Sequence, residues 1–159
     1  MITLFLKIVL FTLVAPGTVT VLLPALLLRG DPGGRVEGIP AALGGLLILT
    51  GVLLYVWCAY AFARFGQGTP APIDPPRHLV DRGLYARTRN PMYLGVVSVL
   101  VGEAALFGSS RLFAYAGAVF LGFHLFTVLY EEPAHRRRFG AAFDEYCRRV
   151  PRWIPRLAR

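Results

Sequence analysis

The sequence predicts an all-α integral membrane protein with about four transmembrane helices, which ends in an amphipathic helix at the membrane interface. Of its 159 residues, 55% are apolar and 16% are charged, whereas charged residues make up about 25% of a soluble domain. Four apolar stretches approach the length of about 20 residues that a helix needs to cross a bilayer. The charge is concentrated in two arginine-rich segments, so we expect a single membrane domain over residues 1–159 rather than a soluble or disordered chain.

The first two spans are predicted at residues 2–28 and 39–65. Pro16 and Pro24 should kink the first helix, because proline removes a backbone hydrogen-bond donor. In the second helix, small residues recur every seven positions and form a stripe suited to close helix packing. These residues are Gly44, Gly51 and Cys58.

The last two spans, at residues 92–108 and 112–130, should form an antiparallel hairpin because only three residues separate them. Each span carries an ionisable residue, Glu103 in one and His124 in the other. Ionisable groups inside a membrane are costly, so both residues are functional candidates. The alternative is that Glu103 and His124 pair with each other across the hairpin.

The distribution of arginine predicts the orientation. Sixteen of the 17 basic residues are arginine, and thirteen of these lie either between Arg64 and Arg89 or after residue 130. The positive-inside rule therefore places that side of the protein, and both termini, in the cytoplasm, with the protein in an inner or cytoplasmic membrane. Arginine favours phosphate and carboxylate groups, and we expect membrane lipids rather than nucleic acid to supply them.

The C-terminal segment, residues 131–159, is predicted to be helical. Pro133 suits the first turn of a helix, and one apolar face follows at helical spacing, formed by Phe139, Phe143, Tyr146 and Val150. Arginines fill the other faces, and Trp153 has the character of an interface anchor. We expect this helix to lie at the level of the lipid head groups. The alternative is a solvated basic helix that touches anionic lipid.

The two cysteines, Cys58 and Cys147, do not have the spacing of metal ligands. No cluster of cysteine and histidine with such spacing occurs elsewhere in the sequence. Neither a metal site nor a disulfide framework is therefore expected.

The longest polar stretch within the apolar body runs from Gly66 to Arg89, where proline and glycine favour a loop of fixed shape. It ends at Asn90-Pro91, a pair that suits the start of a helix. Asn90 is therefore a candidate helix cap. The same helix N-terminus, with Tyr93 on its first turn, is also a candidate site for a carboxylate or a polar cofactor.

Two adjacent acids, Glu131 and Glu132, end the fourth span. Thr127 and His135 fall near the helical face that carries His124 and Glu131. Carboxylates at the edge of a low-dielectric site can bind a ribose hydroxyl, an amine or a cation. The simpler interpretation is that Glu132 caps the helix that Pro133 begins.

Two motifs in these segments resemble the isoprenylcysteine carboxyl methyltransferase and phospholipid methyltransferase family. The first motif is Leu79-Val80-x-x-Gly83-Leu84-Tyr85-x-Arg87-x-Arg89-Asn90-Pro91-Met92-Tyr93-Leu94-Gly95. The second motif is Glu131-Glu132, then Phe139-Gly140, then Tyr146 and Val150-Pro151. The resemblance covers residues 66–155, over half of the chain, and both motifs occur in the family's order between predicted spans.

The resemblance implies an integral membrane enzyme that uses S-adenosylmethionine. In that family the cofactor is held on the cytoplasmic side by the loop before the hairpin, here residues 66–91, and by the first acid after the hairpin. Carried over by position, the cofactor-binding residues are Arg77, His78, Leu79, Val80, Tyr85, Asn90, Pro91, Met92, Tyr93 and Glu131.

The sequence departs from the family pattern at two positions. The best-known members have histidine where Asn90 stands, although asparagine can still cap a helix and donate a hydrogen bond. Isoprenylcysteine enzymes place an arginine against the acceptor carboxylate where this chain has Thr127. A carboxylate acceptor needs a cation, so one of Arg136, Arg137 and Arg138 would have to bind it, or the acceptor is a different group.

We therefore expect a membrane methyltransferase that acts on a lipid, an isoprenoid or another hydrophobic acceptor by O-, N- or S-methylation. An amine or thiol acceptor needs a base, and the candidates are Glu132, His124 and Glu103. One alternative is a non-catalytic membrane protein that keeps the fold for lipid or partner binding. Another is a small channel or transporter with a proton path through Glu103 and His124.

Overall fold

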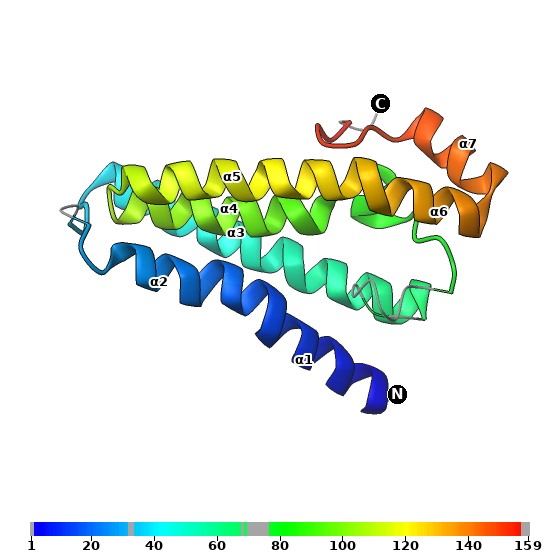
Figure 1. Cartoon of the computed structure of the whole chain (residues 1–159), viewed down its shortest axis with the longest axis horizontal. Coiled ribbons are helices and arrows are strands. Elements are labelled where there is room, and N and C mark those ends of the chain that lie inside the picture. The colour runs from blue at the N-terminus through cyan, green and yellow to red at the C-terminus, as the bar shows by residue number, and fades with distance from the viewer. Residues whose placement is uncertain (1, 32–33, 68, 70–76, 157–159) are drawn as a thin grey trace.

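The computed structural model describes residues 2–31, 34–67, 69 and 77–156, and within these residues every regular element is a helix, as predicted (Figure 1). The chain begins with α1 (Ile2–Gly17), a π-helical turn (Thr18–Leu22) and α2 (Leu23–Leu28). The elements that follow are α3 (Ile39–Ala61), a π turn (Phe62–Gly66), a 3₁₀ turn (Gly83–Ala86), α4 (Pro91–Leu106), α5 (Ser110–Phe126), a π turn (Thr127–Glu131), α6 (Glu132–Phe139) and α7 (Ala141–Arg149).

Three continuous helical segments are long and apolar enough to cross a membrane, namely Thr3–Leu28, Ile39–Gly66 and Ser110–Phe139. The fourth apolar helix, α4, has 16 residues and is therefore about 24 Å long, short of the roughly 30 Å of a bilayer core. It forms the predicted antiparallel hairpin with α5 and packs along α3 (Figure 1).

Two of the π-helical turns end two residues before a proline. The turn Thr18–Leu22 precedes Pro24, and the turn Thr127–Glu131 precedes Pro133. Proline lacks an N–H and its ring clashes with the carbonyl four residues earlier, so a widened turn lets the helix continue past it. The helix that contains the last predicted span, residues 112–130, consequently continues without a break to Phe139.

The backbones of α3 and α4 approach each other closely at their glycines. A Cβ atom built on Gly51 would lie 2.5 Å from the carbonyl oxygen of Gly95, and one built on Gly44 would lie 2.7 Å from that of Gly102. On each of the two antiparallel helices, the glycines that meet are seven residues apart. The small-residue stripe predicted on residues 39–65 is therefore the surface that contacts α4. Cys58, the third member of that stripe, is buried with Val80, Tyr85 and Met92.

The C-terminal segment differs from the single interfacial helix that the sequence predicted. Gly140 has a positive φ of 54° and separates α6 from α7. Phe143, Tyr146 and Val150 are 3–4% exposed and pack with Leu79 of the preceding loop. The apolar face of this segment is therefore covered by the protein itself and not by lipid.

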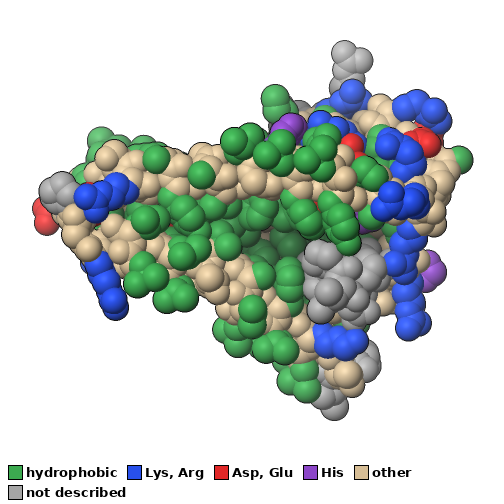
Figure 2. All heavy atoms as spheres, viewed as in Figure 1, with side chains coloured by type: hydrophobic (Ala, Val, Ile, Leu, Met, Phe, Trp, Pro, Cys, Tyr) green, Lys and Arg blue, Asp and Glu red, His purple; other side chains and the backbone are tan. Residues whose placement is uncertain are grey.

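The two described chain ends and the segment between α3 and α4 lie at the same end of the bundle (Figure 1). On the face shown in Figure 2, most lysine and arginine side chains gather at this end, and few lie at the other. The side of the membrane that this basic end faces stays a prediction.

We predict that Gly51→Ala destabilises the protein by about 1–3 kcal/mol, because the new methyl group would collide with the backbone of α4 and force the two helices apart. Thermal unfolding of the purified protein in detergent should occur at a lower temperature. Gly45→Ala is the matched control, since a Cβ there meets nothing within 4 Å. Equal melting temperatures for the two variants would show that the α3–α4 contact is not tight.

Candidate functional site

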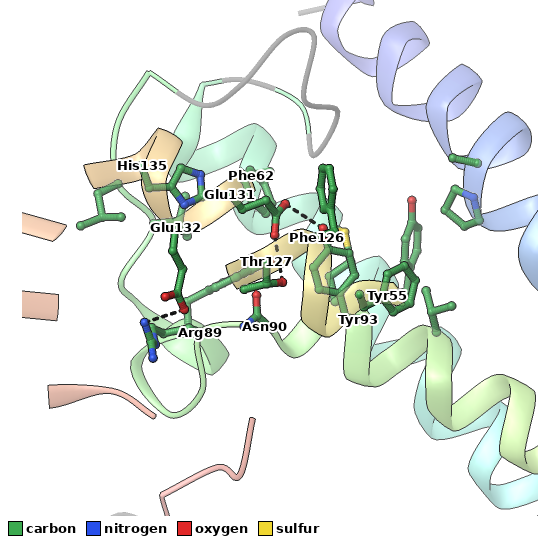
Figure 3. Close-up of a pocket in the computed structure, with 18 of the residues that line it drawn as sticks. Tyr55, Phe62, Arg89, Asn90, Tyr93, Phe126, Thr127, Glu131, Glu132 and His135 are labelled. Carbon is green, nitrogen blue, oxygen red and sulfur yellow. Dashed lines mark hydrogen bonds and ion pairs between the residues drawn. The ribbon is translucent and has the colours of Figure 1, made fainter. Parts of the chain in front are cut away.

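A cavity of about 400 Å³ lies at the basic end of the bundle, between segments that are far apart in the sequence. Its walls come from α1 and the π turn after it, the end of α3, the loop before α4, the first turns of α4, and the continuous helix that runs from α5 to α6. Phe143 and Tyr146 of α7 complete it. Figure 3 shows ten of the lining residues with labels.

Ten residues were expected to bind the cofactor. Seven of them line this cavity, and they come from both motifs. They are Leu79, Val80, Tyr85, Asn90, Met92, Tyr93 and Glu131. Thr127 and Glu132 line it as well. The loop before α4 and the acid pair after α5 therefore meet in one cavity, although about 40 residues separate them in the chain.

Glu131 is held on both carboxylate oxygens. The hydroxyl of Tyr93 donates to Glu131 Oε1 at 2.7 Å, and the hydroxyl of Thr127 donates to Oε2 at 3.3 Å. The ring of Tyr93 stacks on that of Phe123, with centroids 4.3 Å apart. These contacts fix the direction of the carboxylate along one wall of the cavity (Figure 3).

Glu132 points to a different set of partners. It accepts a hydrogen bond from Arg89 Nη1 at 2.9 Å and two from Arg152, at 2.7 Å and 2.9 Å. The side chain of Glu132 is only 13% exposed. Adjacent helical residues point about 100° apart, which lets Glu131 bind Tyr93 while Glu132 binds the two arginines.

The residues after α7 lie back against the start of α4 through backbone groups. Arg89 N–H donates to the carbonyl of Pro151 at 2.9 Å, and the hydroxyl of buried Thr88 lies 3.1 Å from the carbonyl oxygens of both Arg152 and Trp153. Asn90 Nδ2 donates to the carbonyl of Arg152 at 3.1 Å. Asn90 is the N-cap residue of α4, as predicted, but its side chain makes no capping hydrogen bond. The amide holds the C-terminal segment instead.

His124 and Glu103 do not pair across the hairpin. His124 Nδ1 accepts a hydrogen bond from the indole N–H of Trp153 at 3.0 Å. Glu103 lies ten residues along α4 from Tyr93, about 15 Å, and its buried Oε2 has no hydrogen-bond partner among the described residues. Neither residue is part of the cavity wall.

The other predicted site residues also lie outside the cavity wall. Arg77 and His78 are exposed, and Pro91 is buried as the first residue of α4. Arg136 is exposed and binds Asp144 at 2.7 Å, and Arg137 is exposed. The part of the predicted cofactor loop at residues 68 and 70–76 lies outside the described residues.

Sequence reasoning did not predict the aromatic and α1 parts of the wall. Phe123 and Phe126 are ordinary apolar residues of a span, and nothing in the sequence distinguishes them. The same holds for Phe11, Ala15 and Pro16 of α1 and for Val19 of the π turn after it. Tyr146 could have been found, because it belongs to the second motif, and its hydroxyl donates to the carbonyl of Tyr85 at 2.7 Å.

Burial raises the pKa of Tyr85 well above its usual value. Its phenol therefore stays protonated and adds no charge to the cavity wall. The described residues contain no group of three or more His, Cys, Asp or Glu side chains that could hold a metal ion.

Comparisons with known proteins agree with these motifs. The phospholipid methyltransferase family matches residues 39–142, from the start of α3 into α7. A stretch of 74 residues, 46% of the chain, is 34% identical to methanethiol S-methyltransferase 2 of Bradyrhizobium diazoefficiens and covers 27% of that protein. The chain thus spans about a quarter of the length of this curated relative. No solved structure matches the chain.

We predict that Glu132→Gln lowers the stability of the protein by about 1–3 kcal/mol, because Arg89 would lose its charged partner in a poorly solvated place. Thermal unfolding in detergent should show the loss. Glu145→Gln is the control, since Glu145 pairs with exposed arginines on the surface and such pairs contribute about 0–1 kcal/mol. Similar melting temperatures for the two variants would contradict a structural role for the Glu132 ion pairs.

Proposed function

Since the chain belongs to the phospholipid methyltransferase family, we propose that it transfers a methyl group from S-adenosylmethionine to a hydrophobic acceptor. The observation that carries the proposal is the cavity that joins the loop motif to Glu131. One end of this cavity is polar and the other is apolar. That division suits a polar cofactor and an apolar acceptor bound side by side.

The residues at the polar end fit S-adenosylmethionine in chemistry. Glu131 offers a carboxylate to ribose hydroxyls or an amino group, and Asn90 offers an amide. Leu79, Val80 and Met92 offer apolar surface to a purine ring. When bound, the cofactor supplies an electrophilic methyl group on a positively charged sulfur, and aromatic faces such as that of Tyr93 stabilise positive charge.

The charges around the cavity favour an acceptor without a carboxylate. Thr127, where isoprenylcysteine enzymes place an arginine, is 2% exposed and binds Glu131. Arg89 and Arg152 are both bound to Glu132. A carboxylate acceptor would therefore have to compete with Glu132 for Arg89, the arginine that lines the cavity among the described residues.

Aliphatic thiols are the acceptor class that we favour, because the relative from Bradyrhizobium is named for S-methylation of methanethiol. In the transfer, the acceptor sulfur loses its proton and gains the methyl group. Glu132 is occupied by two arginines, so His135, which lines the cavity, is the better placed proton acceptor. Alignment of two reactants in a water-poor cavity can supply much of the rate.

The proposed orientation places the basic end of the bundle, the cavity and both termini in the cytoplasm. The number of arginines at that end supports it through the positive-inside rule. This orientation opens the polar end of the cavity to a water-soluble cofactor. A reporter fused to the C-terminus would contradict the orientation if it were active only outside the cytoplasm.

We predict that Glu131→Gln weakens the binding of S-adenosylmethionine by about tenfold, the effect of losing one charge-assisted hydrogen bond. Isothermal calorimetry in detergent measures it directly. Glu145→Gln is the control and should bind the cofactor as the unmodified protein does. Equal affinities in all three proteins would remove Glu131 from the cofactor site, and absence of binding by the unmodified protein would favour a non-catalytic role.

We predict that purified protein transfers labelled methyl groups to aliphatic thiols and not to the carboxylate of a prenylated cysteine. The physical reason is that Arg89, the arginine in the described lining of the cavity, is already paired with Glu132. Mass spectrometry of the products, with a membrane lipid extract included among the acceptors, identifies the methylated atom. Methyl ester formation on the prenylcysteine would refute the argument from charge.

A further inference from the structure

We infer that α1 closes the acceptor end of the cavity and that Ala15 and Phe11 set the length of the acceptor that fits. The inference rests on the proposed function and adds a specificity-determining element to it. The family match begins at residue 39, so α1 lies outside the matched residues. It nevertheless supplies a wall of the cavity through Phe11, Ala15 and Pro16, and Val19 of the following π turn continues that wall.

The wall residues of α1 and of the π turn after it lie on one side of this helical segment. Phe11, Ala15 and Val19 follow one another at intervals of four residues, and all are half-buried. The neighbouring residues Leu10, Leu13 and Val14 are 62–68% exposed and face away from the bundle. The helix therefore presents a defined surface to the cavity and its other surface to lipid.

Two hydrogen bonds hold this surface in place. The hydroxyls of Thr12 and Tyr55 lie 2.8 Å apart and join α1 to α3. The hydroxyl of Tyr115 donates to the carbonyl of Val19 at 2.9 Å and joins the π turn to α5. Toward its N-terminus, α1 diverges from the other helices (Figure 1). The wall is thus anchored where it borders the cavity.

The wall that α1 contributes is apolar, and three of the ionisable lining residues lie away from it. In Figure 3, Arg89, Glu132 and His135 lie at one side of the cavity, whereas Tyr55 and Tyr93 lie at the side nearest α1. An uncharged apolar chain would gain about 25 cal/mol for each Å² that it buries there. A charged group would lose its hydration without gaining a partner.

Because the cavity is small, the position of the α1 wall limits the length of the acceptor that fits. A volume of about 400 Å³ is near the lower end of the range for a single ligand, so a bound cofactor leaves room for a short acceptor only. Ala15 has the smallest side chain of the wall, and a larger residue there would shorten the acceptor end. Removal of the Phe11 ring would lengthen it.

The test compares ethanethiol with octanethiol as acceptors and measures kcat/KM for each. Ala15→Phe should lower the ratio of octanethiol to ethanethiol activity at least tenfold, and Phe11→Ala should raise it. Binding of S-adenosylmethionine, measured by calorimetry, should be unchanged in both variants. Ala118→Phe is the matched control, because Ala118 is exposed on α5 and does not line the cavity.

The outcomes separate this inference from the proposed function. If the unmodified protein binds no S-adenosylmethionine, the proposed function fails. If it binds the cofactor but methylates neither thiol, a thiol subsite beside α1 is refuted. If it methylates both thiols and their ratio stays within twofold in Ala15→Phe and Phe11→Ala, α1 does not set acceptor length.

Discussion

The arrangement of the cavity depends on the two carboxylates at residues 131 and 132 meeting the start of α4. Neither motif forms a site alone, because the loop supplies arginine, asparagine and tyrosine while the acids lie on another helix. The contacts of Tyr93 with Glu131, and of Arg89 and Arg152 with Glu132, join them at 2.7–2.9 Å. One acid faces the cavity wall and the other is bound by two arginines, so adjacent residues of one type serve different purposes.

Proline explains how the backbone delivers this pair of acids. Pro133 prevents an ordinary α-helical turn around Leu129, and the π turn over Thr127–Glu131 takes its place. Wider turns of this kind are frequent at functional sites. Here the turn contains both Thr127 and Glu131, which share a hydrogen bond. The π turn that Pro133 requires therefore includes two residues that line the cavity.

The sequence predicted the apolar helices and the small-residue stripe, because each leaves a local pattern, and the family resemblance implied that the two motifs meet. Glycine every seven residues and arginine clustered in two segments are visible without coordinates. The sequence could not predict what covers the apolar face of the C-terminal segment. Phe143, Tyr146 and Val150 have the same spacing whether they face lipid or protein. Nor could the sequence predict that Asn90 binds the backbone carbonyl of Arg152 or that His124 binds the side chain of Trp153. Each of these partners lies 29 or more residues away in the chain.

The distribution of charge distinguishes the surface of the protein from its cavity. Described arginines of both arginine-rich segments lie at the basic end, yet Arg89, the arginine in the described lining of the cavity, is paired with Glu132. A strongly basic exterior attracts anionic head groups, whereas the described lining of the cavity is mainly apolar. The wall from α1 adds to the apolar surface of the cavity and adds no charge. Selection among acceptors would then follow from shape and length, and attraction to the membrane surface would follow from charge.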